Sequence, residues 1–144
     1  MNKIYDALFK YGLHDTSISN LIIDNFSVSF QFNEGVYILD ATNKETIKTD
    51  KIYLKIYVEN FAEENIFQHL SCRFFKRGKI LELGIDEFIN KIKPLHNFII
   101  NVYYSEFNNE LLIMGSLDGY DYEFIIENVE RIEYNTAGSE SEYL

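Results

Sequence analysis

The sequence predicts a strand-dominated α+β domain, either a curved antiparallel sheet or a partly open β-barrel, with two short helices. Three observations predict this class. Apolar and polar residues alternate along most of the chain, which is the period of a half-buried strand. Short turn signals such as Asp118-Gly119 separate these alternating runs. Only residues 2–11 and 86–93 show the three-to-four-residue apolar spacing of a helix.

The clearest stretch runs from Asn97 to Glu127, where three alternating runs are joined by two turns. Asp-Gly is a strong signal for a two-residue hairpin loop, because a type I′ turn needs positive φ at both central residues. This loop predicts four cross-strand pairs on one face: Leu117 with Tyr120, Gly115 with Tyr122, Ile113 with Phe124, and Leu111 with Ile126.

A second two-residue loop at Asn108-Asn109 adds a third strand with the same face inward. It predicts that Tyr104 lies opposite Ile113, Val102 opposite Gly115, and Ile100 opposite Leu117. A slip of one residue in either hairpin would turn an apolar row outward, so the agreement favours a meander of three strands. The opposite face, which includes Ile99, Asn101 and Tyr103, is mixed in polarity.

The rest of the chain is predicted from the same patterns. The helix at residues 2–11 ends at Gly12, which is placed to be its C′ residue. A hairpin with a two-residue turn at Asp24-Asn25 then pairs Ile23 with Phe26. The turn at Glu34-Gly35 fits a two-residue or a bulged three-residue loop, and the sequence leaves that choice open. Further predicted elements are a loop at 40–50, a strand at 51–59 with its tyrosines and lysines outward, a hairpin of 66–76 with 79–83, a helix at 86–93 ended by Pro94, and a strand at 129–134.

At 144 residues with 47% hydrophobic content, the chain can bury a sizeable core without disulfides. We predict a single globular domain at residues 1–134 and a disordered acidic tail at 135–144. Because neither a signal peptide nor a membrane span is apparent in the sequence, we expect a cytoplasmic protein.

The formal net charge is −10 and is unevenly distributed. Residues 118–144 carry eight acidic side chains and one arginine, whereas residues 71–93 carry six basic and three acidic ones. A net-negative chain is a poor general binder of nucleic acid, because phosphate contacts need clustered Lys and Arg. A basic protein partner is the better electrostatic match.

The sequence predicts no catalytic residues, no metal site and no cofactor, and therefore no enzyme. His14, His69 and His96 lack the spacing of metal ligands, and the lone Cys72 cannot complete a zinc set. We interpret Cys72 as a small buried hydrophobe. His14-Asp15 could form half of an acid/base site, but the pair also suits a junction where side chains satisfy backbone groups. The seven glycines form no phosphate loop.

These patterns favour a protein-binding module. Tyrosine offers large rigid contact area, and surrounding acids orient a basic partner. Tyr120 and Tyr122 should point away from the face that carries the nearby acids, so only one subset can lie flat on a partner. The predicted partner-binding residues are Asp118, Asp121, Glu123, Tyr103 and Glu127.

The chain opens with a short helix followed by Tyr11-Gly12-Leu13-His14-Asp15, and continues through alternating strands with a strongly acidic balance. In this build it resembles the small cytoplasmic immunity proteins of bacterial contact-dependent inhibition and related polymorphic toxin systems. The resemblance implies a basic nuclease toxin as partner, neutralised by occlusion of its active site or an adjacent surface.

The competing hypothesis is a small-ligand-binding β-barrel, or an enzyme built in such a barrel. It predicts an enclosed pocket of several hundred cubic ångströms, roughly the size that small molecules need, lined by Tyr104, Tyr122 and His14. A filled core with an acidic, aromatic outer patch would instead favour the protein partner.

Overall fold

The structure is a computed structural model that describes residues 3–59, 65–76, 78–92 and 96–136. Its helices are α1 (Lys3–Leu8) and α2 (Ile85–Ile92), with a 3-10 turn, η1 (Ile66–His69). The strands are β1 (Tyr11–Gly12), β2 (Asn20–Ile23), β3 (Ser27–Phe32), β4 (Tyr37–Leu39), β5 (Glu45–Lys48), β6 (Ile52–Val58), β7 (Leu70–Lys76), β8 (Lys79–Leu83), β9 (Asn97–Ser105), β10 (Glu110–Leu117), β11 (Tyr120–Ile126) and β12 (Val129–Thr136).

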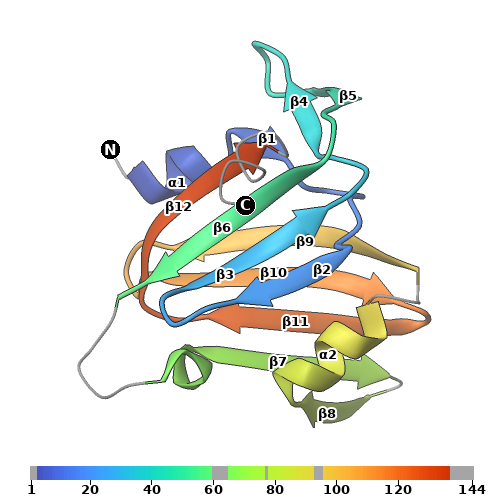
Figure 1. Ribbon diagram of the computed structural model, residues 1–144. Coiled ribbons are helices and arrows are strands. Elements are labelled where there is room, and N and C mark those ends of the chain that lie inside the picture. The colour runs from blue at the N-terminus through green and yellow to red at the C-terminus, as the bar shows by residue number, and fades with distance from the viewer. Residues whose placement is uncertain (1–2, 60–64, 77, 93–95, 137–144) are drawn as a thin grey trace.

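The strands form three antiparallel sheets, which confirms the predicted α+β class. The five-stranded sheet has the order β8-β7-β11-β10-β9, the four-stranded sheet β12-β6-β3-β2, and the small sheet β1-β4-β5. The four-stranded sheet lies across one face of the five-stranded sheet, and α2 lies on the same side (Figure 1). Across the described ranges, none of the three sheets closes into a barrel.

The core lies between these layers. The rings of Phe30 on β3 and Phe124 on β11 meet edge to face at 5.5 Å. Phe88 of α2 packs on Tyr122 and Phe124, with ring centroids 5.2 Å apart in each case. This arrangement explains the helical period of α2, because Ile85, Phe88 and Ile92 are all buried against the strands.

The hairpin of β10 and β11 has the predicted register in every pair, including Leu117 with Tyr120 and Gly115 with Tyr122. Asp118 and Gly119 have φ values of 46° and 84°, as a type I′ turn requires. Tyr122 and Phe124 point inward and are buried. The hairpin of β7 and β8 is also confirmed, with Phe75 opposite Ile80 and Cys72 opposite Leu83.

The register of β9 on β10 was predicted wrongly. A four-residue loop, 106–109, places Ser105 opposite Glu110 and Tyr104 opposite Leu111. This shift of two residues keeps the same side chains inward, so the pattern of faces could not detect it. A bulge then makes Ile100 the extra residue, because Met114 pairs with Asn101 and Gly115 with Ile99. Ile99 is therefore buried and Ile100 exposed, the reverse of the prediction.

The first hairpin shows the same kind of error. Ile23 pairs with Val28 and Leu21 with Phe30, so the loop spans four residues rather than two. The Asp24 carboxylate closes this wider loop by accepting hydrogen bonds from the backbone N–H groups of Phe26 and Ser27, at 2.8 and 2.7 Å. Phe26 is consequently exposed in the loop instead of pairing with Ile23.

Two further predictions, at Glu34-Gly35 and at residues 40–50, fail for one reason. Gly35, with φ of 81°, makes a turn, but the chain after it does not return along β3. Instead β4 pairs with β1 and β5, and β5 occupies part of the predicted loop. Every residue of β5 is exposed, so it shows no apolar alternation. Figure 1 shows the β4–β5 hairpin projecting from the two larger sheets.

The turn of this hairpin is held by one carboxylate. Asp40 accepts hydrogen bonds from the backbone N–H groups of Lys44, at 3.0 Å, and Thr42, at 2.8 Å. The Thr42 hydroxyl adds a third, at 2.7 Å. These hydrogen bonds stabilise the ionised carboxylate and keep the pKa of Asp40 below its ordinary value. The bond from the Lys44 N–H contributes most, and the two bonds from Thr42 contribute less.

Smaller differences concern the element ends. The first helix stops at Leu8, whose carbonyl accepts a 2.7 Å hydrogen bond from the Tyr134 hydroxyl, and Gly12 lies in β1 rather than at a helix end. Residues 66–69 form η1 instead of extending β7.

Tyr53, predicted to face outward on β6, is buried. The last strand extends to Thr136, so the predicted tail cannot begin at Asn135. Pro94 and residues 137–144 lie outside the described residues.

Candidate functional site

The candidate site is the face of the five-stranded sheet that points away from α2 and the four-stranded sheet. We call it the outer face. Strand register defines it as rows of neighbouring side chains that run across the strands. Its members are Ile80 and Glu82 of β8, Ser71, Arg73 and Phe75 of β7, Asp121, Glu123 and Ile125 of β11, Leu112, Met114 and Ser116 of β10, and Phe98, Asn101 and Tyr103 of β9.

The outer face has an apolar centre. One row places Ile125, Leu112 and Tyr103 side by side, and the next places Met114 between Glu123 and Asn101. The aliphatic side chains are half-buried by their neighbours, and Tyr103 is 51% exposed. The Tyr103 hydroxyl accepts a 2.8 Å hydrogen bond from the Asn101 amide, which orients the ring. This combination of an oriented tyrosine and aliphatic neighbours is typical of protein contact surfaces.

Three of the five predicted binding residues lie on the outer face, and the other two lie beyond its two ends. Asp121, Glu123 and Tyr103 belong to the outer face itself. Asp118 is exposed in the β10–β11 turn at one end. Glu127 is exposed at the other end, where the chain leaves β11 and crosses to β12 in the four-stranded sheet. At about 3.3 Å per residue, this separation is roughly 30 Å, so only an extended partner can contact both ends.

The structure changes the electrostatics that the sequence suggested. The basic strand β7 pairs directly with the acidic strand β11. Arg73 and Glu123 form an ion pair across the two strands at 3.2 Å. Lys76 lies over the Tyr120 ring, 4.4 Å from its centroid. Part of the acidic charge is therefore compensated within the sheet, whereas Asp118, Asp121 and Glu127 form no ion pair with any other residue that the structure describes.

Sequence reasoning missed two of the aromatic residues on this face, Phe75 and Phe98. Phe75 lies next to Asp121 because β7 pairs with β11, two strands that are far apart in the sequence. Phe98 reaches the outer face because of the bulge at Ile100, which inverts the start of β9. In the sequence, the bulge would show as one extra residue in the alternation between Ile99 and Val102. The alternation does not reveal it, because either Ile99 or Ile100 can face inward and both are apolar.

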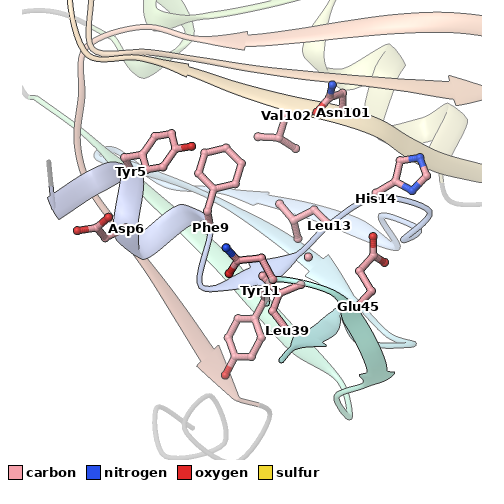
Figure 2. Close-up of a pocket in the computed structure, with 12 residues that line it drawn as sticks. Tyr5, Asp6, Phe9, Tyr11, Leu13, His14, Leu39, Glu45, Asn101 and Val102 are labelled. Atoms are coloured by element: carbon pink, nitrogen blue, oxygen red, sulfur yellow. Dashed lines mark hydrogen bonds between the residues drawn. The ribbon is translucent and has the colours of Figure 1, made fainter. Parts of the chain in front are cut away.

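A second feature is an open cleft of about 530 Å³ between β9 and the segment that contains α1 and β1 (Figure 2). It is lined by Tyr5, Asp6, Phe9, Tyr11, Gly12, Leu13, His14, Leu39, Asn43, Glu45, Asn101 and Val102. The cleft contains His14 but neither Tyr104 nor Tyr122. Tyr122 is buried in the core, so the enclosed pocket predicted around these three residues is not what the structure shows.

The histidines do not converge. His14 lies on the surface, with its Nδ1 3.2 Å from a carboxylate oxygen of its neighbour Asp15. His69 is buried, and its Nδ1 lies 3.0 Å from the Asn128 amide nitrogen at the crossing between the large sheets. Within the described residues, no group of three or more His, Cys, Asp or Glu side chains could hold a metal ion. Within the same ranges, no helix has the length and apolar content to cross a membrane.

Comparison with known proteins yields only partial matches. The chain is similar to the uridine kinase of Clostridium perfringens (strain 13 / Type A), with 30% identity over 87 residues, covering 58% of this chain and 40% of that kinase. A uridine kinase of Staphylococcus haemolyticus is 33% identical over 67 residues, covering 46% of this chain and 30% of the kinase. The chain spans less than half the length of these relatives. No protein-family model and no solved structure matches it.

Cys72 provides a prediction about reactivity. It lies on the inner face of β7 and is buried, and this burial raises the pKa of its thiol from 9.0 to about 12. The thiolate is the reactive form, so we expect negligible reaction with a colourimetric disulfide reagent at pH 8. The same protein in concentrated urea should react rapidly and completely. Fast labelling of the native protein would show that β7 opens readily from β11.

Proposed function

We propose that this chain is a protein-binding module, specifically a cytoplasmic immunity protein that neutralises a basic toxin by covering its active site or an adjacent surface. On this proposal the chain is not an enzyme, and the outer face is the contact surface. The partner is a basic protein domain, rather than a nucleic acid or a membrane.

The observation that carries the proposal is the asymmetry of the five-stranded sheet. Its inner face is covered by α2 and the four-stranded sheet, whereas its outer face keeps an apolar centre that is half exposed. Asp118 and Glu127 lie at the two ends of this centre, and Asp121 lies beside it on β11. An apolar centre with a charged rim is the usual anatomy of a protein interface. Its length of roughly 30 Å along β11 suits a macromolecule.

A second candidate function is small-ligand binding or catalysis, which the cleft and the partial similarity to uridine kinases favour. A kinase must hold nucleotide phosphates, and this sequence contains no G-x-x-x-x-G-K-[ST] phosphate loop. Calorimetric titration with uridine, alone and in the presence of ATP and Mg²⁺, separates the two functions. A saturable heat of binding at micromolar uridine would favour the small-ligand or enzyme function. The absence of such heat would favour the protein-binding module.

The decisive test uses the gene upstream of this one. If that gene encodes a large secreted protein, its C-terminal domain would be produced from an inducible promoter in a bacterium, with and without this chain. We expect growth arrest without the chain and full colony formation with it. If the domain is toxic and this chain does not restore growth, the immunity function is wrong for that pair. A non-toxic domain, or the absence of such a gene, would contradict it in the same way.

Charge reversal on the outer face gives the first interface prediction. We expect Asp121→Lys to slow association with a basic partner about three- to tenfold at low salt, because exposed charges steer encounter. The difference should shrink as salt is raised to screen these charges. Surface plasmon resonance at two ionic strengths measures it.

Glu130→Lys is the matched control, because Glu130 is exposed on β12 in the other large sheet and its substitution changes the net charge equally. Equal association rates for the two variants would remove Asp121 from the interface. Thermal melts should show both variants folded.

A further inference from the structure

The cleft beside β9 arises from the path of the N-terminal segment. This segment is fastened to the edge of β9 by two backbone hydrogen bonds, in which the Asp15 N–H donates to the Ile99 carbonyl and the Ile99 N–H donates to the Thr16 carbonyl, both at 2.8 Å. Asn97 adds a second attachment, exchanging hydrogen bonds of 2.9 Å with the backbone of Ile18. Beyond Ile99 the N-terminal segment and β9 separate, and the cleft opens between β1 and β9.

One part of the cleft is apolar and aromatic. The rings of Tyr5 and Phe9 pack against each other on α1, with centroids 4.5 Å apart. Leu13 and Val102 are buried below them. Figure 2 shows Tyr5, Phe9 and Val102 around the same space, whereas the Tyr11 ring points away from it. Lys10 already lies over the Tyr11 ring, 5.5 Å from its centroid, so the aromatic wall of the cleft is Tyr5 with Phe9.

The other end of the cleft is polar and acidic. Figure 2 shows Glu45 and His14 there, from β5 and the β1–β2 connection. Glu45 can lie against β1 because Gly12 has no side chain. A Cβ at Gly12 would approach the Glu45 Cγ to 3.1 Å.

The charge of the lining has one sign. Among the described residues, the lining contains the carboxylates Asp6 and Glu45 and no lysine or arginine. His14 is paired with a further acid, Asp15, whose carboxylate oxygen lies 3.2 Å from the His14 Nδ1. The Glu45 carboxylate, at the end of the cleft away from Tyr5 and Phe9, attracts a positive charge. The apolar wall of the cleft adds affinity for a hydrocarbon stem.

We propose that the cleft binds an organic cation, namely an ammonium or guanidinium group carried on an apolar or aromatic stem. The stem lies on Tyr5, Phe9 and Val102, and the charged group lies near Glu45. This binding does not depend on the outer face being an interface. The cation has two possible sources of the same chemistry: a free amine, or a lysine or arginine side chain of another protein.

The test is a titration followed by the backbone amide signals of Gly12, Leu13 and Val102 in heteronuclear NMR spectra. The probes are tyramine, its uncharged analogue 4-ethylphenol, and a blocked Gly-Arg-Gly peptide. We expect tyramine to shift these signals saturably and to bind at least about fivefold more tightly than 4-ethylphenol, because only tyramine carries a positive charge for the Glu45 carboxylate to attract.

Glu45→Gln removes the carboxylate charge, so it should weaken tyramine binding by about the same factor and leave 4-ethylphenol binding unchanged. Glu130→Gln on β12 is the control and should change neither. If tyramine saturates the signals and the peptide does not, the ligand is a free amine. If the peptide also saturates them, the cleft can take a lysine or arginine side chain of another protein. Equal affinity for tyramine and 4-ethylphenol, shifts centred on other residues, or no saturation by any probe would overturn the proposal. None of these results bears on the outer face, which the growth test addresses separately.

Discussion

Replacing Phe124 with alanine is expected to lower the free energy of unfolding by about 3 to 5 kcal/mol. Phe124 is fully buried where the two large sheets and α2 meet, with its ring 5.5 Å from that of Phe30 and 5.2 Å from that of Phe88. Removing the ring takes away its hydrophobic burial and leaves a cavity that three separate elements would have to close. Urea denaturation monitored by circular dichroism measures the change.

Phe107→Ala is the control for Phe124→Ala. Phe107 lies in the β9–β10 loop and is 97% exposed, so its loss should change stability by less than about 0.5 kcal/mol. A loss below about 1 kcal/mol at Phe124 would mean that the layers are not packed as described. Two variants of the same chemistry thus separate burial in the core from the mere loss of an aromatic ring.

The second large effect is expected at Gly115. A Cβ built on Gly115 would lie 2.3 Å from the Tyr122 Cζ, which is inside van der Waals contact. Tyr122 cannot easily move aside, because it is buried and packs on Phe88. Gly115→Ala should therefore cost about 1 to 3 kcal/mol through overpacking. The same urea measurement applies.

Gly84→Ala is the control for this substitution. The nearest atom to a Cβ there is the Glu87 Oε1 at 3.5 Å, so only a small change is expected. Shortening the clashing side chain should also abolish the penalty, and Gly115→Ala combined with Tyr122→Leu should be no less stable than Tyr122→Leu alone. Additive losses in this double-mutant cycle would show that the two residues do not clash.

The local features of the meander could be predicted from the sequence because they depend on neighbouring residues. The Asp118-Gly119 turn has the positive φ values that its residue types favour. Once that turn is set, alternation determines that Tyr122 and Phe124 face inward. The same reasoning placed Asp121 and Glu123 together on the outer face.

Other features needed the folded chain. Four-residue loops at 24–27 and 106–109 shift the registers by two residues, and alternation cannot distinguish a shift of two from none. Every residue of the edge strand β5 is exposed, so its backbone pairing with β4 forms it and no buried apolar row marks it in the sequence. The cleft depends on where the N-terminal segment leaves β9, which no local pattern encodes.

By itself, the sequence determined the strand-dominated class, the β10–β11 reversal and which side chains of β11 look inward. Only the tertiary structure decided that basic β7 lies beside acidic β11, that Arg73 offsets Glu123, and that Phe75 and Phe98 join the outer face. The physical reason is that alternation records whether a side chain is buried, whereas the choice of a neighbouring strand depends on contacts between residues far apart in the chain.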